Sequence, residues 1–192
     1  VIEDREAITI GSTVTHAAIE DGRITDPTYG FLAQVASGIA YRAVRTRGTI
    51  GGSLAHADPA ADWLSVLTAL GAEITLASSR SRRRVPLATF VRGAMETELE
   101  PDELLTGIRI PRFSQNARFG FHKICRKVGE FAEAIGVVVE DPERDTFCIV
   151  AGATGGRPLV IAMRTRPAPK TLAIEQAQAL LQEAKLAGDS YE

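Results

Sequence analysis

The stretch that says most about the fold is Arg45-Thr46-Arg47-Gly48-Thr49-Ile50-Gly51-Gly52-Ser53-Leu54, which is followed directly by Ala55-His56-Ala57-Asp58-Pro59. Adjacent glycines let a backbone approach another group closely, and they leave successive N–H groups free to face an anion. Asp58-Pro59 fits a helix start, because Asp is a good N-cap and Pro suits the first helical position. The stretch therefore predicts a loop that cradles a phosphorylated ligand, although a Gly-Gly pair also fits a simple tight turn.

The run from Arg45 through Trp63 to Ile74 resembles the flavin-binding subunit of the molybdenum hydroxylases. That group includes the medium subunit of aerobic carbon monoxide dehydrogenase and the flavin domain of xanthine dehydrogenase. The same resemblance continues in Gly120–Lys127 with Glu130-Phe131-Ala132, and in Gly152–Pro158. Compared with this family, the chain is expected to lack the N-terminal flavin subdomain, with its second glycine-rich loop, and part of the C-terminal lobe.

The resemblance implies a set of flavin contacts rather than catalytic side chains. The pyrophosphate would be held by the backbone N–H groups and hydroxyls of Thr49, Ile50, Gly51, Gly52 and Ser53. His56 and Asp62 would border the nucleotide portion. Leu105 would touch the isoalloxazine ring, and Lys123 would face the ring or the phosphates. A structural alternative stays open for Asp62 at a helix start, for Leu105 in a buried strand and for Lys123 on an exposed strand.

The resemblance also implies a division of labour among subunits. FAD on this chain would pass electrons from iron-sulfur clusters on a small subunit to an external acceptor, while a large subunit carries the molybdenum cofactor and oxidises the substrate. A dimer of heterotrimers is expected. Only Cys125 and Cys148 are present, which is too few for an iron-sulfur cluster on this chain. The alternative is a flavin-free assembly or interaction module derived from the same subunit.

The composition is that of an ordinary globular protein. The chain has 192 residues, of which 45% are hydrophobic and 24% charged, and its formal net charge is -2. Such a charge predicts no general affinity for nucleic acid or anionic membranes. No apolar stretch is long enough to span a bilayer, and no signal-like N-terminus is visible, so a cytoplasmic location is expected. The basic run Ser79–Arg84 is typical of a solvated hairpin tip, although it also suits a phosphate or an acidic surface.

Hydrophobic patterns on either side of the glycine-rich stretch predict an α+β fold. Helices are expected at three places and a fourth near the C-terminus: Ser12–Glu20, from Asp26-Pro27 to Ile39, Pro59–Leu70 and Thr171–Leu186. Strands are expected at Ala7–Gly11, Ala72–Ala77, Arg82–Leu87, the run ending at Pro111, Phe119–Ile124, Ala134–Glu140 and Phe147–Ala153. The predicted organisation is a FAD-binding lobe at 1–112 and a C-terminal lobe at 116–192, with an antiparallel sheet and a flanking helix.

Two further observations limit the functional hypotheses. His16 has no carboxylate or cysteine partner nearby in the sequence, so it receives no role as a metal ligand. A stand-alone flavin reductase would need its own reductant site. No Gly-x-Gly-x-x-Gly pattern is present, and Gly152-Ala153-Thr154-Gly155-Gly156 lacks that spacing, so this third hypothesis ranks last.

Overall fold

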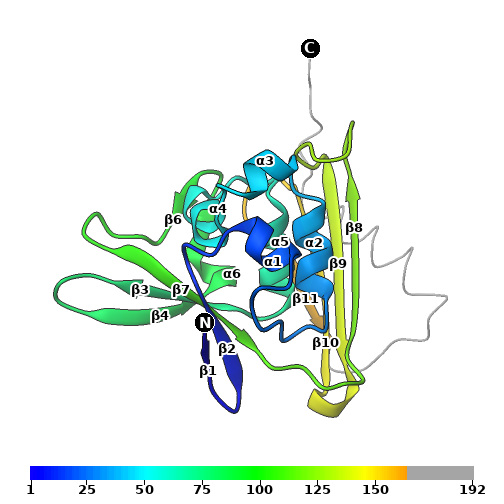
Figure 1. Cartoon of the computed structure of the whole chain (residues 1–192), viewed down its shortest axis with the longest axis horizontal. Helices are drawn as coiled ribbons and strands as arrows, with labels where there is room; N and C mark the ends of the chain where they lie inside the picture. Colours follow the sequence, from blue (N-terminus) through cyan, green and yellow to red (C-terminus); the bar gives the residue numbers. More distant parts are fainter. Residues whose placement is uncertain (164–192) are drawn as a thin grey trace.

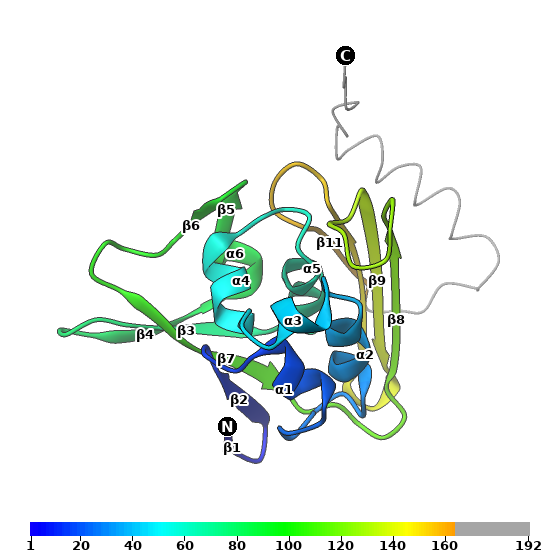
Figure 2. The same ribbon diagram turned by 45° about the horizontal axis from the view of Figure 1, so that its top comes forward.

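The computed structural model describes residues 1–163, and it has an α+β fold with two large antiparallel sheets and a two-stranded hairpin. Figures 1 and 2 show the helices packed between the sheets, with β1 and β2 on one side of the molecule and β8 and β9 on the other. A buried helical layer between two sheets removes apolar side chains of all three layers from water. The predicted fold class is confirmed.

The first sheet has five strands in the order β1-β2-β7-β3-β4. Its inner face carries the fully buried isoleucines Ile8, Ile10, Ile74 and Ile108, which alternate with polar or exposed residues as a half-buried sheet requires. A separate short hairpin, β5-β6, lies beside α4 and α6 in Figure 2. The bounds are β1 Ile2–Glu3, β2 Ala7–Gly11, β3 Glu73–Ala77, β4 Arg82–Pro86, β5 Val91–Gly93, β6 Glu96–Thr97 and β7 Leu104–Pro111.

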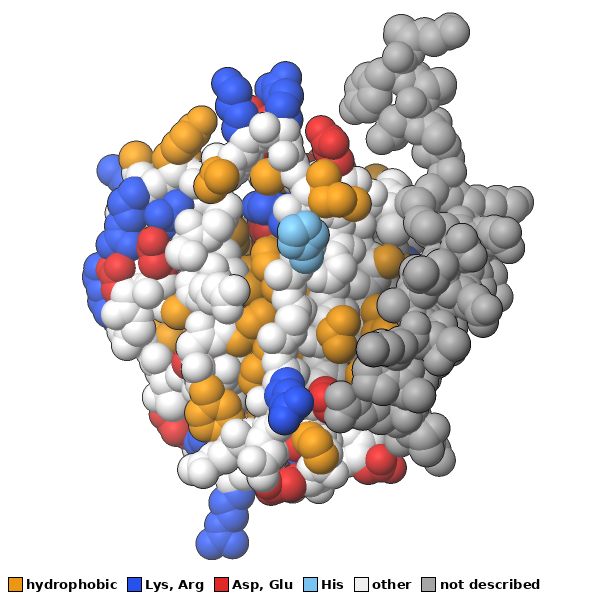
Figure 3. Space-filling view, turned by 90° about the vertical axis from the view of Figure 1, so that its right-hand side faces the viewer, with side chains coloured by type: hydrophobic (Ala, Val, Ile, Leu, Met, Phe, Trp, Pro, Cys, Tyr) orange, Lys and Arg blue, Asp and Glu red, His pale blue; other side chains and the backbone are white. Residues whose placement is uncertain are grey.

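The second sheet has four strands in the order β11-β10-β9-β8. Val137, Val139 and Val150 fill its inner face and are completely buried. Figure 3 shows apolar patches on this side of the molecule. The exposed apolar side chains of the outer strands β8 and β9 include Ile124 and Val138. The bounds are β8 Arg118–Ile124, β9 Ala134–Asp141, β10 Thr146–Gly152 and β11 Leu159–Met163.

The central helix of the fold is α5, in which all eight residues are buried. It packs on β9 and β10 of the second sheet and also contacts α4 and α6. Gly152 of β10 permits this approach, because a Cβ at that position would lie 2.9 Å from the Cβ of Ser65. The helices are α1 His16–Glu20, α2 Phe31–Ser37, α3 Arg42–Arg45, α4 Ile50–His56, α5 Asp62–Ala69 and α6 Leu87–Phe90, with a 3-10 turn at Pro142–Arg144.

The predicted strands agree with the structure, whereas three helix starts and one loop differ. The run Thr49–Ser53 is the cap and first turn of helix α4, not a loop. Helix α5 begins at Asp62 rather than Pro59, because the Asp58 carboxylate accepts a hydrogen bond from the Ala60 N–H and forms a turn instead of a cap. The helix predicted at Thr171–Leu186 lies outside the described residues.

Helices α1 and α2 also begin later than predicted. Thr15 caps α1 by accepting a hydrogen bond from the Ala18 N–H. Asp26 binds the N–H and hydroxyl of Thr28 in a turn, and α2 then starts at Phe31. A short polar side chain thus caps the first helix and closes a turn before the second. Strands β1, β5, β6 and β11 were not predicted.

The predicted lobe boundary falls in the connection between β7 and β8, where Ser114 anchors the chain. Its N–H and hydroxyl donate to the Asp141 carboxylate at 2.8 and 2.7 Å, and these bonds hold the pKa of Asp141 below its ordinary value despite burial. One hydrophobic core continues across this connection, from Ile8 in the first sheet to Val150 in the second. The division into two domains stays a prediction.

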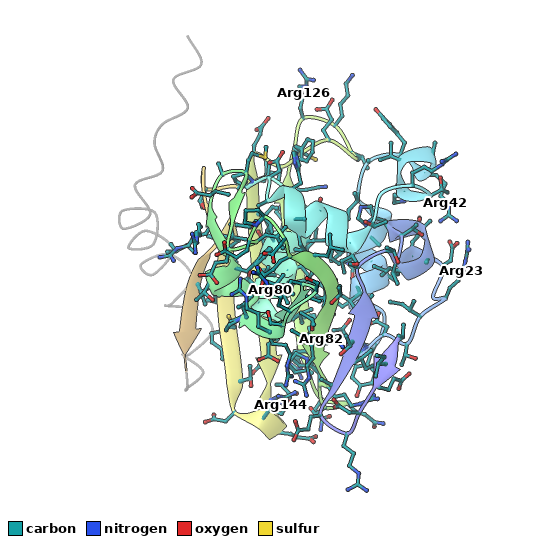
Figure 4. The ribbon with its side chains drawn as sticks, turned by 90° about the vertical axis from the view of Figure 1, so that its left-hand side faces the viewer. Arg23, Arg42, Arg80, Arg82, Arg126 and Arg144 are labelled. Carbon is teal, nitrogen blue, oxygen red and sulfur yellow. The ribbon has the colours of Figure 1, made fainter. Side chains whose placement is uncertain are left out.

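Positive charge is dispersed over the described surface and largely paired with acids. Figure 4 shows Arg126 far from Arg80 and Arg82, and Arg42 near Arg23. Arg42 and Arg23 both bind Asp21, and Arg126 pairs with Glu130. Among residues 1–163, no helix combines the length and apolar character needed to cross a bilayer.

Candidate functional site

A cleft of ≈ 500 Å³ opens where helices α3, α4 and α5 meet the loop between β8 and β9. Its volume falls within the range of about 300–1,000 Å³ that is usual for small-molecule sites. Most of the wall is apolar or backbone, with a few polar side chains. The lining residues are His16, Ile39, Ala40, Val44, Arg47, Gly48, Thr49, Gly52, Ser53, His56, Asp58, Ala61, Asp62, Trp63, Gly129, Glu130 and Phe131.

The glycine-rich run contributes one wall of the cleft through the first turn of α4. Thr49 caps this helix, and its Oγ1 accepts the Gly52 N–H at 3.0 Å. The N–H groups of Ile50 and Gly51 donate to the carbonyls of Val14 and Ser12, at 3.0 and 2.9 Å. The prediction that these two N–H groups face an anion is therefore wrong, because the neighbouring chain already satisfies them.

The two adjacent glycines serve different structural purposes. A Cβ on Gly51 would lie 2.7 Å from the Ser12 carbonyl oxygen, so this glycine allows the backbone of Ser12 to pass against α4. Gly52 is exposed at the cleft, where only the Thr49 hydroxyl would meet an added Cβ. The first glycine therefore serves the fold, and the second keeps the cleft wall open.

Arg45, which opens the quoted stretch, holds the backbone of two other lining residues, Ile39 and Ala40. Its guanidinium donates to the carbonyls of Ile39 and Ala40 at 2.8 and 2.9 Å and forms an ion pair with Glu20 at 2.8 Å. Ala40 has a positive φ of 43°, a conformation that side chains rarely adopt and that these bonds stabilise. Arg45 thus shapes the cleft without lining it.

The loop between β8 and β9 completes the cleft from the second sheet. Gly129 forms a β-bridge with Ile39. Its φ is +91°, and a Cβ there would lie 2.7 Å from the carbonyl oxygen of Ala40, so two independent constraints favour glycine at this position. Glu130 and Phe131 then follow directly at the rim.

Asp62 and Lys123, both predicted as ligand contacts, pair with each other. The Lys123 Nζ lies 3.0 Å from Asp62 Oδ1 and donates to the Gly38 carbonyl at 3.1 Å. The angles at the carboxylate depart from normal hydrogen-bond geometry, so the contact is best described as an ion pair. Burial raises the pKa of Asp62, and the Lys123 charge opposes this rise. Asp62 lines the cleft, whereas Lys123 does not.

Of the remaining predicted contacts, some line the cleft and others do not. His56 lies on the cleft wall at the end of α4. Leu105 lies on β7 opposite Leu76 and packs against the core, away from the cleft lining. The structure thus gathers Thr49, Gly52, Ser53, His56 and Asp62 around one cavity, and it leaves Ile50, Gly51, Leu105 and Lys123 outside its lining.

Two lining residues that received no role from the sequence are joined directly. The indole N–H of Trp63 donates to Nδ1 of His16 at 3.0 Å, although the two residues are 47 positions apart. Burial, helped by the positive charge of Arg45, lowers the pKa of His16 to about 4. Neither an apolar periodicity nor a nearby partner in the sequence identifies this pair. In the part of the chain described, no cluster of three or more His, Cys, Asp or Glu suits a metal ion.

Comparison with known proteins gives a consistent result. Residues 1–113 match a family described as the FAD binding domain in molybdopterin dehydrogenase. The chain is 33% identical over 160 residues to the beta subunit of caffeine dehydrogenase from Pseudomonas sp. (strain CBB1), which covers 81% of this chain and 54% of that protein. It is 34% identical over 137 residues to the medium chain of carbon monoxide dehydrogenase from Hydrogenophaga pseudoflava, covering 71% and 48%.

The three-dimensional comparison agrees with this result. The solved carbon monoxide dehydrogenase from Hydrogenophaga pseudoflava that lacks the Mo-pyranopterin moiety superposes with a TM-score of 0.77 at 31% identity. The superposition covers 83% of this chain and 56% of the solved chain. This chain therefore spans about half the length of the relatives it matches.

Proposed function

Since this chain belongs to the family of FAD-binding domains in molybdopterin dehydrogenases, we propose that it binds FAD in the cleft between α4, α5 and the β8–β9 loop. The observation that carries this proposal is the convergence of Thr49, Gly52, Ser53, His56 and Asp62, from the matched region, on one cavity. The fit is supported by Gly48 and Gly52, whose missing side chains leave backbone accessible in the lining. The cleft volume suits part of a dinucleotide.

Within this cleft, the chain's own groups would have distinct tasks. The hydroxyls of Thr49 and Ser53 are available as hydrogen-bond partners at the wall, and Arg47 supplies a positive charge that suits a diphosphate. His56 would border the nucleotide portion. The ion pair of Asp62 with Lys123 would hold α5 against the second sheet rather than touch the phosphates. Leu105 and Lys123 do not line the cleft, so any influence of these residues on the flavin would be transmitted through the lining residues.

We further propose that the chain is the FAD-carrying, electron-transferring component of a molybdenum hydroxylase. Bound flavin supplies one- and two-electron chemistry, while the protein sets its position and surroundings. A large subunit with the molybdenum cofactor and a small subunit with iron-sulfur clusters would be the partners, in a dimer of heterotrimers located in the cytoplasm. Matches to subunits of caffeine dehydrogenase and carbon monoxide dehydrogenase support this assignment.

A second candidate function is a flavin-free assembly or interaction module. It is favoured by one observation, namely that the N–H groups of Ile50 and Gly51 are already bonded within the chain. The two functions are separated by the visible absorption spectrum of the purified chain, before and after FAD is added. Flavin bands that remain with the protein after gel filtration support FAD binding, whereas a colourless protein that takes up no FAD refutes it and favours the interaction module.

A further inference from the structure

His16 occupies an unusual position at the start of α1, where only 6% of its surface is exposed. Its Nδ1 lies 3.0 Å from the indole nitrogen of Trp63. An indole nitrogen can only donate, so Nδ1 must be the acceptor and cannot carry a proton. The proton of the neutral ring therefore sits on Nε2. Trp63 thus selects a single tautomer of His16 and fixes the plane of its ring.

The Nε2 edge of the ring remains open towards the cleft. A Cβ on Gly48 would lie 3.0 Å from both Cδ2 and Nε2 of His16, so the absence of a side chain at Gly48 keeps this edge uncovered. Both residues line the cleft. The fully buried polar side-chain atoms without a partner in residues 1–163 belong to Asp62, Ser65 and Thr68. Nε2 of His16 makes no hydrogen bond within residues 1–163, and it is not among these fully buried atoms. It is therefore partly accessible, and His16 lines the cleft.

The environment also keeps this donor uncharged. Desolvation lowers the pKa of His16 to about 4, and the neighbouring Arg45 acts in the same direction. An uncharged N–H offers direction but no charge, which suits a carbonyl oxygen, a ring nitrogen or a hydroxyl better than a diphosphate. The cleft wall provides Arg47 separately as a cation.

We propose that His16 is a positioning residue of the flavin site, which donates a hydrogen bond from Nε2 to an uncharged acceptor atom in the isoalloxazine or ribityl part of the flavin. This inference rests on the proposed function of the cleft. Trp63 sets the direction of the donor, and Gly48 leaves the path clear. The histidine was given no role from the sequence, and nothing in the family description assigns one to it.

The test uses two substitutions of His16, one that mimics Nδ1 of the imidazole and one that mimics Nε2. His16→Asn keeps an acceptor near Nδ1 for Trp63 but removes the donor at Nε2. His16→Gln places an amide near the Nε2 position. Dissociation constants of the 192-residue chain for FAD, riboflavin and ADP are measured by fluorescence titration, and folding is checked by thermal unfolding. His16→Asn is expected to weaken FAD and riboflavin binding about threefold to tenfold, because one uncharged hydrogen bond is lost.

ADP binding and the unfolding temperature should change little in His16→Asn, and His16→Gln should recover most of the flavin affinity. The absorption maxima of bound flavin should also shift in His16→Asn, which a purely structural role would not produce. Equal FAD affinity in His16→Asn and the unchanged chain, or equal losses for ADP and riboflavin, would overturn the inference. A chain that binds no FAD before any substitution would instead overturn the proposed function.

Gly48→Ala gives an independent test from the other side of the path. The added methyl group would lie 3.0 Å from Nε2 and would also approach the Val44 carbonyl at 3.3 Å. We expect a loss of riboflavin affinity similar to that of His16→Asn, and the double variant should lose little more than either single variant, since both block the same bond. Additive losses in the double variant would contradict a shared mechanism.

Discussion

Replacing Lys123 by methionine removes one charge of the buried ion pair that joins β8 of the second sheet to the start of α5. The Lys123 ammonium lies 3.0 Å from Asp62 Oδ1 and 3.1 Å from the carbonyl oxygen of Gly38. The two charged side chains are 9% and 8% exposed. Methionine keeps most of the apolar stem of lysine and removes the charge, so the change isolates the electrostatic contribution.

The expected loss of stability follows from what happens to the Asp62 carboxylate. Breaking a buried ion pair by removing one partner destabilises proteins by about 3–5 kcal/mol, because the remaining charge is uncompensated. Protonation of Asp62 sets an upper limit on the loss of folding stability. Moving a group with an ordinary pKa of 3.8 to its neutral form at pH 7 costs about 4 kcal/mol. We therefore expect a loss of about 3–4 kcal/mol, or a fall in the unfolding temperature of about 6–16 °C.

The loss should depend on pH in a defined direction. Burial already raises the pKa of Asp62, and the charge of Lys123 counteracts that rise. Without Lys123 the folded-state pKa rises further, so the folded protein binds a proton over a wider range than the unfolded chain. Stability then falls as pH increases from the unfolded value of the carboxyl towards its raised folded value. The deficit of Lys123→Met should therefore be smallest near pH 4 and largest at neutral pH.

Circular dichroism during thermal and urea unfolding, between pH 4 and pH 8, measures both effects. Lys127→Met is the matched control, because Lys127 is an exposed lysine four positions away. The double variant Asp62→Leu with Lys123→Met removes both charges and should recover most of the lost stability. A deficit below about 1 kcal/mol at pH 7, the range of an exposed pair, would refute the reasoning. A deficit that is the same at every pH would refute it as well.

Three smaller predictions concern other positions. Gly51→Ala should lower the free energy of unfolding by about 1–3 kcal/mol in urea titrations, because the added Cβ would lie 2.7 Å from the Ser12 backbone. Gly22→Ala is the control. Its Cβ would meet no neighbouring atom, so this variant reports only the strain of a positive φ. Thr49→Ala should lose about 1 kcal/mol through the missing cap of α4, and Thr49→Ser should lose much less. Because burial raises the pKa of Cys148, its alkylation by iodoacetamide at pH 7 should be slower in the folded protein than in urea, and equal rates would show that the thiol is not shielded.

Sequence patterns were sufficient for the fold class and for seven of the strands, namely β2, β3, β4, β7, β8, β9 and β10. Period-two alternation in β8 and β9, and the turn between β3 and β4, depend on local residue order, so the sequence alone carries them. Helix starts were less predictable, because Asp26 and Asp58 each stabilise a turn before the helix. A short polar residue can cap a helix or close a turn, and only the following backbone decides which.

Five of the nine predicted site residues line one cleft, and their role as flavin contacts stays a prediction. The quoted stretch does form a cleft wall, yet the resemblance could not show that Ser12 and Val14 occupy the N–H groups of Gly51 and Ile50. These partners come from more than 35 residues upstream in the sequence, with no local signal. The pairing of Asp62 with Lys123 was missed for the same reason, since each residue was interpreted against a ligand rather than against the other.

The cleft depends on the loop between two strands of the second sheet, although the family match ends at Phe113. Three of its lining residues, Gly129–Phe131, come from the β8–β9 loop beyond that match. The loop is held by the bridge of Gly129 to Ile39, and the second sheet is held by the ion pair of Lys123 with Asp62 at the start of α5. These contacts flank the cavity, so a shift of the second sheet would move the rim relative to α4. Lys123 lies outside the lining, and it can therefore influence ligand binding through the position of the second sheet.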